Sequence, residues 1–321
     1  IKTALNGRID YFAGLPEKDS ELAGFYDKGR GSIFGHYKKS EYKAFDFSKA
    51  NLYRKYGRRW YREFINETHR RLRSWGLNTI GNWSDMRVCR AGKTPYVASM
   101  GYRDVPIEGS ESPWGTFPDP FADDAMESLA RRMEHEKGGS IDDPWCIGYF
   151  VDNELVWGND YGLALSSLKS GADQPAKQEF VKDLKVKYGE IEKLNEQWGS
   201  EYKSWGAMLE SKQTPDEERA MADLKAFYKK LAETYYRRIN EVLKKYAPNQ
   251  LYLGSRFSAY NDVAARAAAK YCDIVSYNLY YYDISTHDNP EGSVDKPIIV
   301  GEFHFGALDR GLFHTGLKSA R

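Results

Sequence analysis

The feature that most constrains the fold is a short apolar run that recurs along the chain and alternates with longer amphipathic stretches. Six such runs are predicted as strands, at residues 77–83, 94–101, 146–151, 251–256, 273–279 and 297–303. Largely apolar strands are typical of a parallel sheet that is covered on both faces. Strands that alternate with helices predict a repeated βα fold, which is either a barrel or a doubly wound sheet.

Helical spacing of apolar side chains predicts helices between these runs, at residues 60–75, 121–136, 176–198, 217–246 and 263–271. Gly76 has the place of a C-cap after the first helix, and Asp119-Pro120 is a start signal for the second. The first 50 residues, which are rich in Gly, Tyr and Lys, are expected to form a long loop.

A doubly wound nucleotide-binding sheet is disfavoured because its glycine fingerprint is incomplete. Gly29-Arg30-Gly31 supplies only the first two glycines, and Phe34 occupies the third position. No convincing strand precedes this run, and no phosphate-binding Gly-x4-Gly-Lys-Ser/Thr sequence occurs in the chain.

The favoured fold is therefore a (β/α)8 TIM barrel that forms one catalytic domain over residues 1–321. A closed barrel of this type has eight strands, whereas the chain contains six recognisable runs. We accordingly expect an incomplete barrel that lacks part of strand one and all of strand eight. A smaller, non-barrel fold is the alternative.

Composition excludes some classes of partner and leaves others open. The formal net charge is +1, so charge indicates no nucleic acid partner, and no apolar run approaches the roughly 20 residues of a membrane span. The 24 Tyr, 15 Phe and 8 Trp indicate either a large aromatic core or surfaces for sugar stacking. The three cysteines, Cys89, Cys146 and Cys272, lack the spacing of a disulfide framework and are predicted to be buried thiols.

Two of the predicted strands end in acidic residues. Run 146–151 leads directly into Asp152, Asn153 and Glu154, and run 297–303 carries Glu302, which shares a strand face with His304. Barrel enzymes place catalytic groups at the C-terminal ends of their strands, and a carboxylate in a buried strand is costly unless it is paired or functional. An acidic strand end in plain contact with solvent is the alternative for the first run.

A pair of glutamates at such strand ends fits glycoside hydrolysis. One carboxylic acid protonates the leaving oxygen, while the other carboxylate attacks the anomeric carbon; a separation of roughly 5–5.5 Å marks this retaining route. The competing interpretation is a metal-dependent barrel enzyme in which Asp152, Glu154, Glu302 and His304 bind a divalent ion. We expect neither a metal nor another cofactor.

Two longer strings resemble glycoside hydrolase family 50, the β-agarases, among the clan A barrels. They are Gly-Tyr-Phe-Val-Asp-Asn-Glu at 148–154 and Gly-Glu-Phe-His-Phe-Gly-Ala-Leu-Asp-Arg-Gly at 301–311, and Asp-Tyr-Phe-Ala-Gly-Leu-Pro at 10–16 also fits. The resemblance implies that Glu154 is the acid/base, that Glu302 is the nucleophile, and that Asn153 binds the sugar 2-hydroxyl. We expect the last strand of the family pattern to be absent, and with it the aromatic platform usually found there.

The resemblance also implies further residues around the site. Of the tyrosines at the end of the fifth run, Tyr277 is preferred as the hydrogen-bond donor to Glu302, with Tyr280 second. Asn82, Trp83, Arg256 and His304 lie at or near strand ends and are expected to line the cleft, although structural pairing or core packing fits each of them as well.

The expected activity is retaining cleavage of the β-1,4-galactosidic bonds of agarose, with release of neoagarobiose or neoagaro-oligosaccharides by a secreted or periplasmic enzyme. Two alternatives stay open. Family 42 β-galactosidases share the Asp-Asn-Glu ending, and a relative that only binds sugar would keep the same fold.

Overall fold

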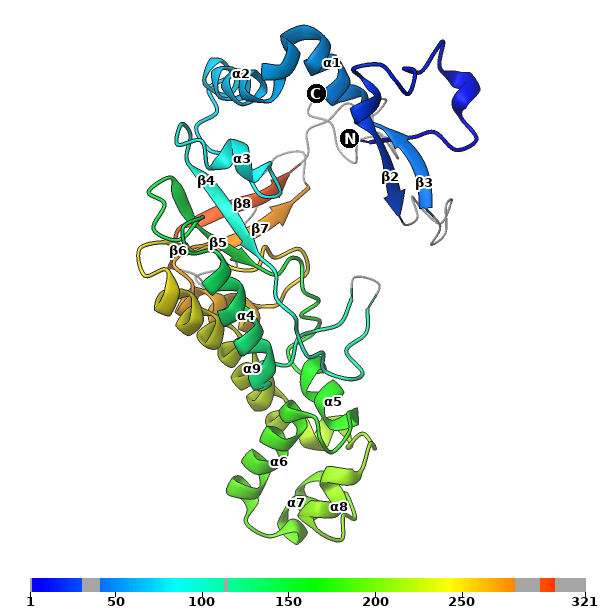
Figure 1. The fold of residues 1–321 in the computed structure, drawn as a ribbon. Coiled ribbons are helices and arrows are strands. Elements are labelled where there is room, and N and C mark those ends of the chain that lie inside the picture. Colours follow the sequence, from blue (N-terminus) through cyan, green and yellow to red (C-terminus); the bar gives the residue numbers. More distant parts are fainter. Residues whose placement is uncertain (1, 31–40, 113–114, 281–294, 304–321) are drawn as a thin grey trace. The chain divides into compact units, whose positions relative to one another are not determined.

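The computed structural model describes residues 2–30, 41–112, 115–280 and 295–303, which form two compact units (Figure 1). The first unit comprises residues 1–78 and 86–93, and the second comprises residues 79–85 and 94–321. Each unit has a buried core of its own, and the single catalytic domain over residues 1–321 stays a prediction. All described site residues lie in the second unit.

The first unit is built on a small antiparallel sheet. Its strands are β1 (Thr3–Ala4), β2 (Tyr26–Arg30) and β3 (Glu41–Phe45), in the order β1-β3-β2. Leu5, Phe45 and Ala50 form its buried core. The expectation of a long loop over the first 50 residues was wrong for these strands, because each is short and polar on one face and lacks the apolar run of a buried parallel strand.

Helices make up the rest of the first unit: η1 (Ile9–Tyr11), η2 (Ala23–Phe25), α1 (Phe47–Tyr56), η3 (Gly57–Arg59), α2 (Trp60–Ser74) and α3 (Met86–Cys89). The Asp46 side chain caps α1 by accepting a 3.0 Å hydrogen bond from the backbone N–H of Lys49. The predicted helix at 60–75 is confirmed as α2.

The second unit contains parallel strands that pair in chain order. Strands β4 (Tyr96–Met100), β5 (Cys146–Val151) and β6 (Leu251–Tyr252) form one parallel sheet, and β7 (Val275–Leu279) pairs with β8 (Ile298–Phe303) in another. Single parallel bridges, Ile80 to Tyr96 and Phe257 to Tyr277, extend this series at both sheets. All six predicted runs thus appear as parallel neighbours, which confirms an α/β fold of βα repeats.

Two of the six runs are reduced to two residues or fewer, whereas the others lose three residues at most. Residues 77–83 contribute only the bridge at Ile80, and the run at 251–256 ends as a strand at Tyr252. Gly254 and Arg256 both have positive φ angles, of 82° and 51°. The chain therefore leaves the extended conformation there, which turns the Arg256 side chain in a direction that a regular strand would not allow.

The helices of the second unit are α4 (Asp123–His135), α5 (Gly162–Lys169), α6 (Pro175–Tyr188), α7 (Ile191–Trp198), α8 (Trp205–Glu210), α9 (Glu217–Tyr246) and α10 (Asp262–Tyr271). The single helix predicted at 176–198 is divided into α6 and α7 by Gly189, whose φ is 74°. Helix α9 has the predicted bounds and packs against α4, α5 and α10 (Figure 1).

Aromatic rings fill the space between α9 and the strands. Trp157 is fully buried, stacks on Tyr236 and meets Tyr235, Phe117 and Phe257. Much of the aromatic content is therefore core. The three cysteines are buried thiols, as predicted. In the part of the chain that is described, no helix has both the length and the apolar character needed to cross a bilayer.

Candidate active site

The end of β5 carries the first candidate carboxylate in an unusual backbone conformation. Asp152 and Glu154 have φ angles of 61° and 54°. Trp83 and Arg256 are also left-handed, so four of the five non-glycine residues with positive φ in the described ranges lie together here. Such strain gathers at functional sites. The left-handed backbone also lets the adjacent side chains of Asn153 and Glu154 face the same residue, Asn278, which a regular strand would not allow.

The second carboxylate, Glu302, lies on β8 between two donors. Its Oε1 is 3.1 Å from Nη1 of Arg256, and its Oε2 accepts a short hydrogen bond from the hydroxyl of Tyr280. Burial and the neighbouring carboxylate raise the pKa of Tyr280 above its ordinary value, so this hydroxyl keeps its proton. Oε2 of Glu302 is thereby held as an acceptor, while Oε1 faces the guanidinium in an ion pair.

The tyrosine that contacts Glu302 is thus Tyr280 and not Tyr277, the residue that the sequence put first. Tyr277 is fully buried, and its ring packs against Phe257 and Tyr260. The two tyrosines are three positions apart. Because Leu279 is the last residue of β7, Tyr280 lies just beyond the strand and escapes its alternation of faces.

Arg256 is entirely buried, so it cannot line an open cleft as the sequence suggested. Its guanidinium stacks over the Trp83 ring at 4.1 Å and lies 5.3 Å from the Phe150 ring. With the Asn82 amide turned so that its oxygen faces the guanidinium, that oxygen accepts two bonds of 3.1 and 3.0 Å. Arg256 is therefore placed to orient Glu302 by its charge and not to contact a ligand itself.

The charges of Glu154 and Glu302 both influence the buried guanidinium of Arg256. Burial lowers the pKa of its guanidinium, and the negative charges of Glu302 and Glu154 oppose that effect. The two glutamates also both act on Tyr280. They are therefore near the same two groups, although 148 positions separate them in the sequence.

Gly301 is required for the approach of Arg256 to Glu302. A Cβ atom at position 301 would lie 2.6 Å from Cδ of Arg256 and 3.1 Å from Oδ1 of Asn278. The first distance is far below van der Waals contact. A larger residue here would displace the arginine from the glutamate that follows it.

Asn278 links the two strand ends that carry the candidate carboxylates, and sequence reasoning missed it. Its Nδ2 donates to Oε1 of Glu154 at 2.7 Å and lies 3.4 Å from Oδ1 of Asn153. On β7 it pairs in register with Glu302 on β8. An asparagine inside an apolar strand was the available signal, since a buried amide needs partners.

Asp152 is fixed by two tyrosines from distant elements. Its Oδ2 accepts hydrogen bonds from Tyr235 on α9 at 2.6 Å and from Tyr102, in the loop after β4, at 3.2 Å. Burial raises the pKa of Asp152 to about 6, and the two hydroxyls only partly offset it. No local signal in the sequence connects these three residues.

The raised pKa of Asp152 predicts a pH dependence of stability. Asp152 holds a proton up to about pH 6 in the folded protein, whereas in the unfolded chain it releases the proton near pH 3.8. Protonation of Asp152 therefore stabilises the folded state; this stabilisation is full below pH 4 and is lost as the pH rises through 6. The loss should amount to about 1 to 3 kcal/mol. Urea unfolding between pH 4 and 7 should show this decline in the unsubstituted protein but not in Asp152→Asn. Equal slopes for the two proteins would contradict the assignment.

A metal-binding cluster is not evident in the described residues. No group of three or more His, Cys, Asp or Glu side chains there lies within reach of one ion. Asp152 is directed to tyrosine hydroxyls, and His304, which the metal hypothesis also needs, lies outside the described residues.

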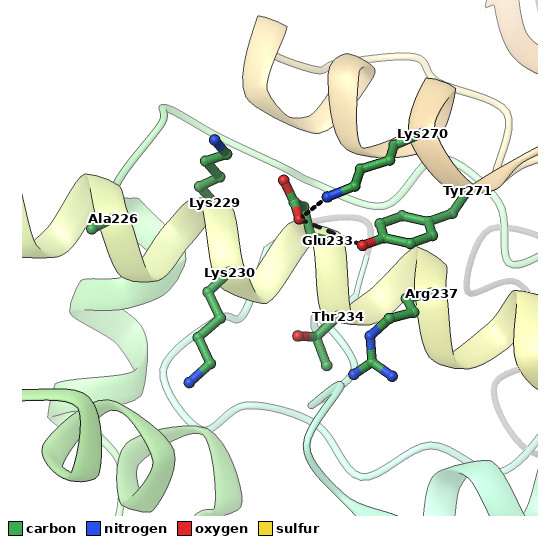
Figure 2. A pocket seen from close by; sticks show the side chains of 8 residues that line it. All are labelled: Ala226, Lys229, Lys230, Glu233, Thr234, Arg237, Lys270 and Tyr271. Atoms are coloured by element: carbon green, nitrogen blue, oxygen red, sulfur yellow. Dashed lines mark hydrogen bonds and ion pairs between the residues drawn. The ribbon is translucent and has the colours of Figure 1, made fainter. Parts of the chain in front are cut away.

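Charged groups also gather in a surface pocket on α9 and α10 (Figure 2). It is lined by Ala226, Lys229, Lys230, Glu233, Thr234, Arg237, Lys270 and Tyr271. Lys270 donates to Glu233 at 2.7 Å, and Lys230 is paired with Asp183 at 2.7 Å. These cations are largely satisfied within the protein, and no residue of the carboxylate site lines the pocket.

Comparisons with known proteins show which proteins this chain is similar to. The model of the β-galactosidase family, glycoside hydrolase 42, matches residues 128–304, which include Glu154 and Glu302. β-Agarase B of Vibrio sp. (strain JT0107) is 37% identical over 335 residues, covering 98% of this chain and 35% of that protein.

Two solved structures are similar over nearly the whole chain. An agarase, AgWH50C, has a TM-score of 0.82 at 34% identity and covers 96% of this chain and 46% of its own. An exo-β-agarase has a TM-score of 0.80 at 33% identity, covering 97% of this chain and 44% of its own. The chain therefore spans about a third of the curated relative and less than half of each solved one.

Proposed function

The chain belongs to glycoside hydrolase family 50, within the clan that includes the family 42 β-galactosidases, and on that basis we propose that it hydrolyses agarose. The proposed reaction is retaining cleavage of β-1,4-galactosidic bonds with release of neoagarobiose or neoagaro-oligosaccharides. Agarases are the relatives that match along nearly its full length, which favours this substrate.

The observation that carries the proposal is the meeting of two glutamates from separate parallel strands. Glu302 is held by Arg256 and Tyr280, while Glu154 is held by Asn278, which is itself the register partner of Glu302. A hydrolase with two catalytic carboxylates needs such a fixed pair across one bond of the sugar.

In the proposed reaction the two carboxylates have different tasks. Glu302 attacks the anomeric carbon as Glu154 delivers its proton to the leaving oxygen, which gives a glycosyl-enzyme and the shortened galactan. Glu154 then removes a proton from water, whose oxygen replaces Glu302 at the anomeric carbon. The Tyr280 hydroxyl directs Oε2 of Glu302, and the Arg256 cation faces Oε1, until one of the oxygens reacts.

Two exposed residues next to the carboxylates are proposed to bind the sugar. Asn153 is exposed and adjacent to the acid/base, where its amide can bond a ring hydroxyl. Trp83 is 68% exposed, and Arg256 stacks against its ring. An indole held in this way offers a fixed apolar surface for the C–H face of a pyranose.

A family 42-type β-galactosidase is the second candidate, because the matching family model carries that description. A sugar-binding relative without catalysis is less well supported, since both glutamates and their donors are in place. Further proposals are that the parallel strands form part of a (β/α)8 catalytic barrel over residues 1–321, and that the enzyme acts in the periplasm or outside the cell, where a gel-forming polymer is accessible.

Substrate choice is tested directly by incubating the purified enzyme with agarose, porphyran and 4-nitrophenyl β-galactoside. We expect agarose to be the preferred substrate, with neoagarobiose as the main product by chromatography and mass spectrometry. The near-neutral charge is consistent with a galactan of low sulfation. Rapid hydrolysis of the simple galactoside with agarose left intact would instead support the β-galactosidase function.

A further inference from the structure

Asn278 occupies a position where it can influence both catalytic strands. The register between β7 and β8 shifts after Tyr277, so that Asn278 pairs with Glu302 and not with Gly301. Its side chain is only 5% exposed. The irregularity therefore presents a buried amide next to the strand of the nucleophile.

The orientation of this amide is fixed by its neighbours. Nδ2 is directed at two oxygen acceptors, Oε1 of Glu154 at 2.7 Å and Oδ1 of Asn153 at 3.4 Å. The opposite orientation would bring the amide oxygen against both of these oxygens. In the observed orientation Oδ1 is buried without a hydrogen-bond partner, in the space beside Gly301. A buried oxygen without a partner costs free energy, and this cost is tolerated where the N–H donors of the amide are needed.

We propose that Asn278 is a positioning residue that fixes which oxygen of Glu154 carries the catalytic proton. An amide N–H can only donate, so Oε1 of Glu154 is kept as an acceptor and the proton resides on Oε2. That proton passes to the glycosidic oxygen as its bond to the anomeric carbon breaks. In the second step Oε2 takes one proton back from water. The weaker contact with Asn153 aligns the adjacent sugar-binding amide at the same time.

The inference rests on the proposed function, and its test is a difference between two substrates. A 4-nitrophenolate leaving group departs without protonation, whereas a sugar hydroxyl depends on it. In Asn278→Leu, a variant of similar size without the donor, kcat/KM should fall roughly 10- to 100-fold for neoagarotetraose. The value for 4-nitrophenyl neoagarobioside should stay within about threefold of the parent, with little change in KM for either substrate.

Asn195→Leu is the matched control. Asn195 makes comparable side-chain bonds, to Tyr202 and Ser200, but touches no residue of the site. It should lower thermal stability without separating the two substrates. Asn278→Asp keeps the shape of the side chain and serves if the leucine variant does not fold; it should give the same selective loss, because two carboxyl groups at this distance compete for one proton.

The outcomes are distinct. A selective loss for neoagarotetraose supports the positioning role. Equal losses for both substrates, or none, would overturn it while leaving the agarase function intact. A parent enzyme that cleaves no galactan and no galactoside would overturn the proposed function, and the inference with it.

Discussion

Replacing Glu302 with Gln should lower kcat on neoagaro-oligosaccharides by roughly 10⁴-fold or more, because the amide is nearly isosteric but a poor nucleophile. The same change removes the negative charge that faces the buried guanidinium of Arg256. We therefore also expect a lower unfolding temperature, since a buried cation loses its counter-charge. Initial rates and thermal unfolding measure the two effects separately.

The role of Glu302 is established by what accumulates on the enzyme. With a 2-fluoro glycoside, mass spectrometry should detect a covalent adduct on the parent enzyme and none on Glu302→Gln. Glu233→Gln is a suitable control, because this glutamate is ion-paired with Lys270 on the surface of α9, away from the site. Turnover near the parental rate in Glu302→Gln would refute the assignment, as would an adduct on another residue.

Glu154→Gln should produce a different kinetic pattern. A glutamine cannot donate a proton, so kcat/KM for natural oligosaccharides should fall by roughly 10²- to 10⁴-fold. For 4-nitrophenyl neoagarobioside the first step should be nearly preserved, while release of the sugar becomes slow. A burst of 4-nitrophenol followed by slow turnover is the expected time course.

Added azide should restore turnover of the aryl glycoside in Glu154→Gln, because a small anion can attack the glycosyl-enzyme without a general base. It should not restore Glu302→Gln, in which no glycosyl-enzyme forms. Equal losses of Glu154→Gln on aryl and natural substrates, with no effect of azide, would count against Glu154 as the acid/base.

The local pattern of the chain was sufficient to predict the parallel strands and the long helices. Run 146–151 became β5 with its predicted bounds, and 217–246 became α9. Both are specified by their own residues: a continuous apolar run in one, and a capped stretch of helical periodicity in the other. The comparisons confirmed the family resemblance, which depended on strings of adjacent residues around Glu154 and Glu302.

Local patterns failed to predict the conformation of segments that depend on partners distant in the sequence. The strands β2 and β3 are stabilised by pairing with each other and by a small core, so their own residues predicted only a loop. The left-handed backbone at Arg256 ended a predicted strand early. The backbone of Arg256 is hydrogen-bonded to Ser276 and Glu154, which lie 20 positions after it and 102 before it.

The sequence by itself determined that two glutamates would stand at the ends of parallel strands, because an apolar run that stops at a polar residue fixes both the strand and its end. Only the tertiary structure decided which side chains surround them. Tyr280 contacts Glu302 because the strand ends one residue earlier, and Asn278 on β7 donates to Glu154 at the end of β5. The hydrogen bond from Tyr280 to Glu302 joins residues that are 22 positions apart in the sequence, and the one from Asn278 to Glu154 joins residues that are 124 positions apart. Both follow from strand pairing and burial, which no local pattern encodes.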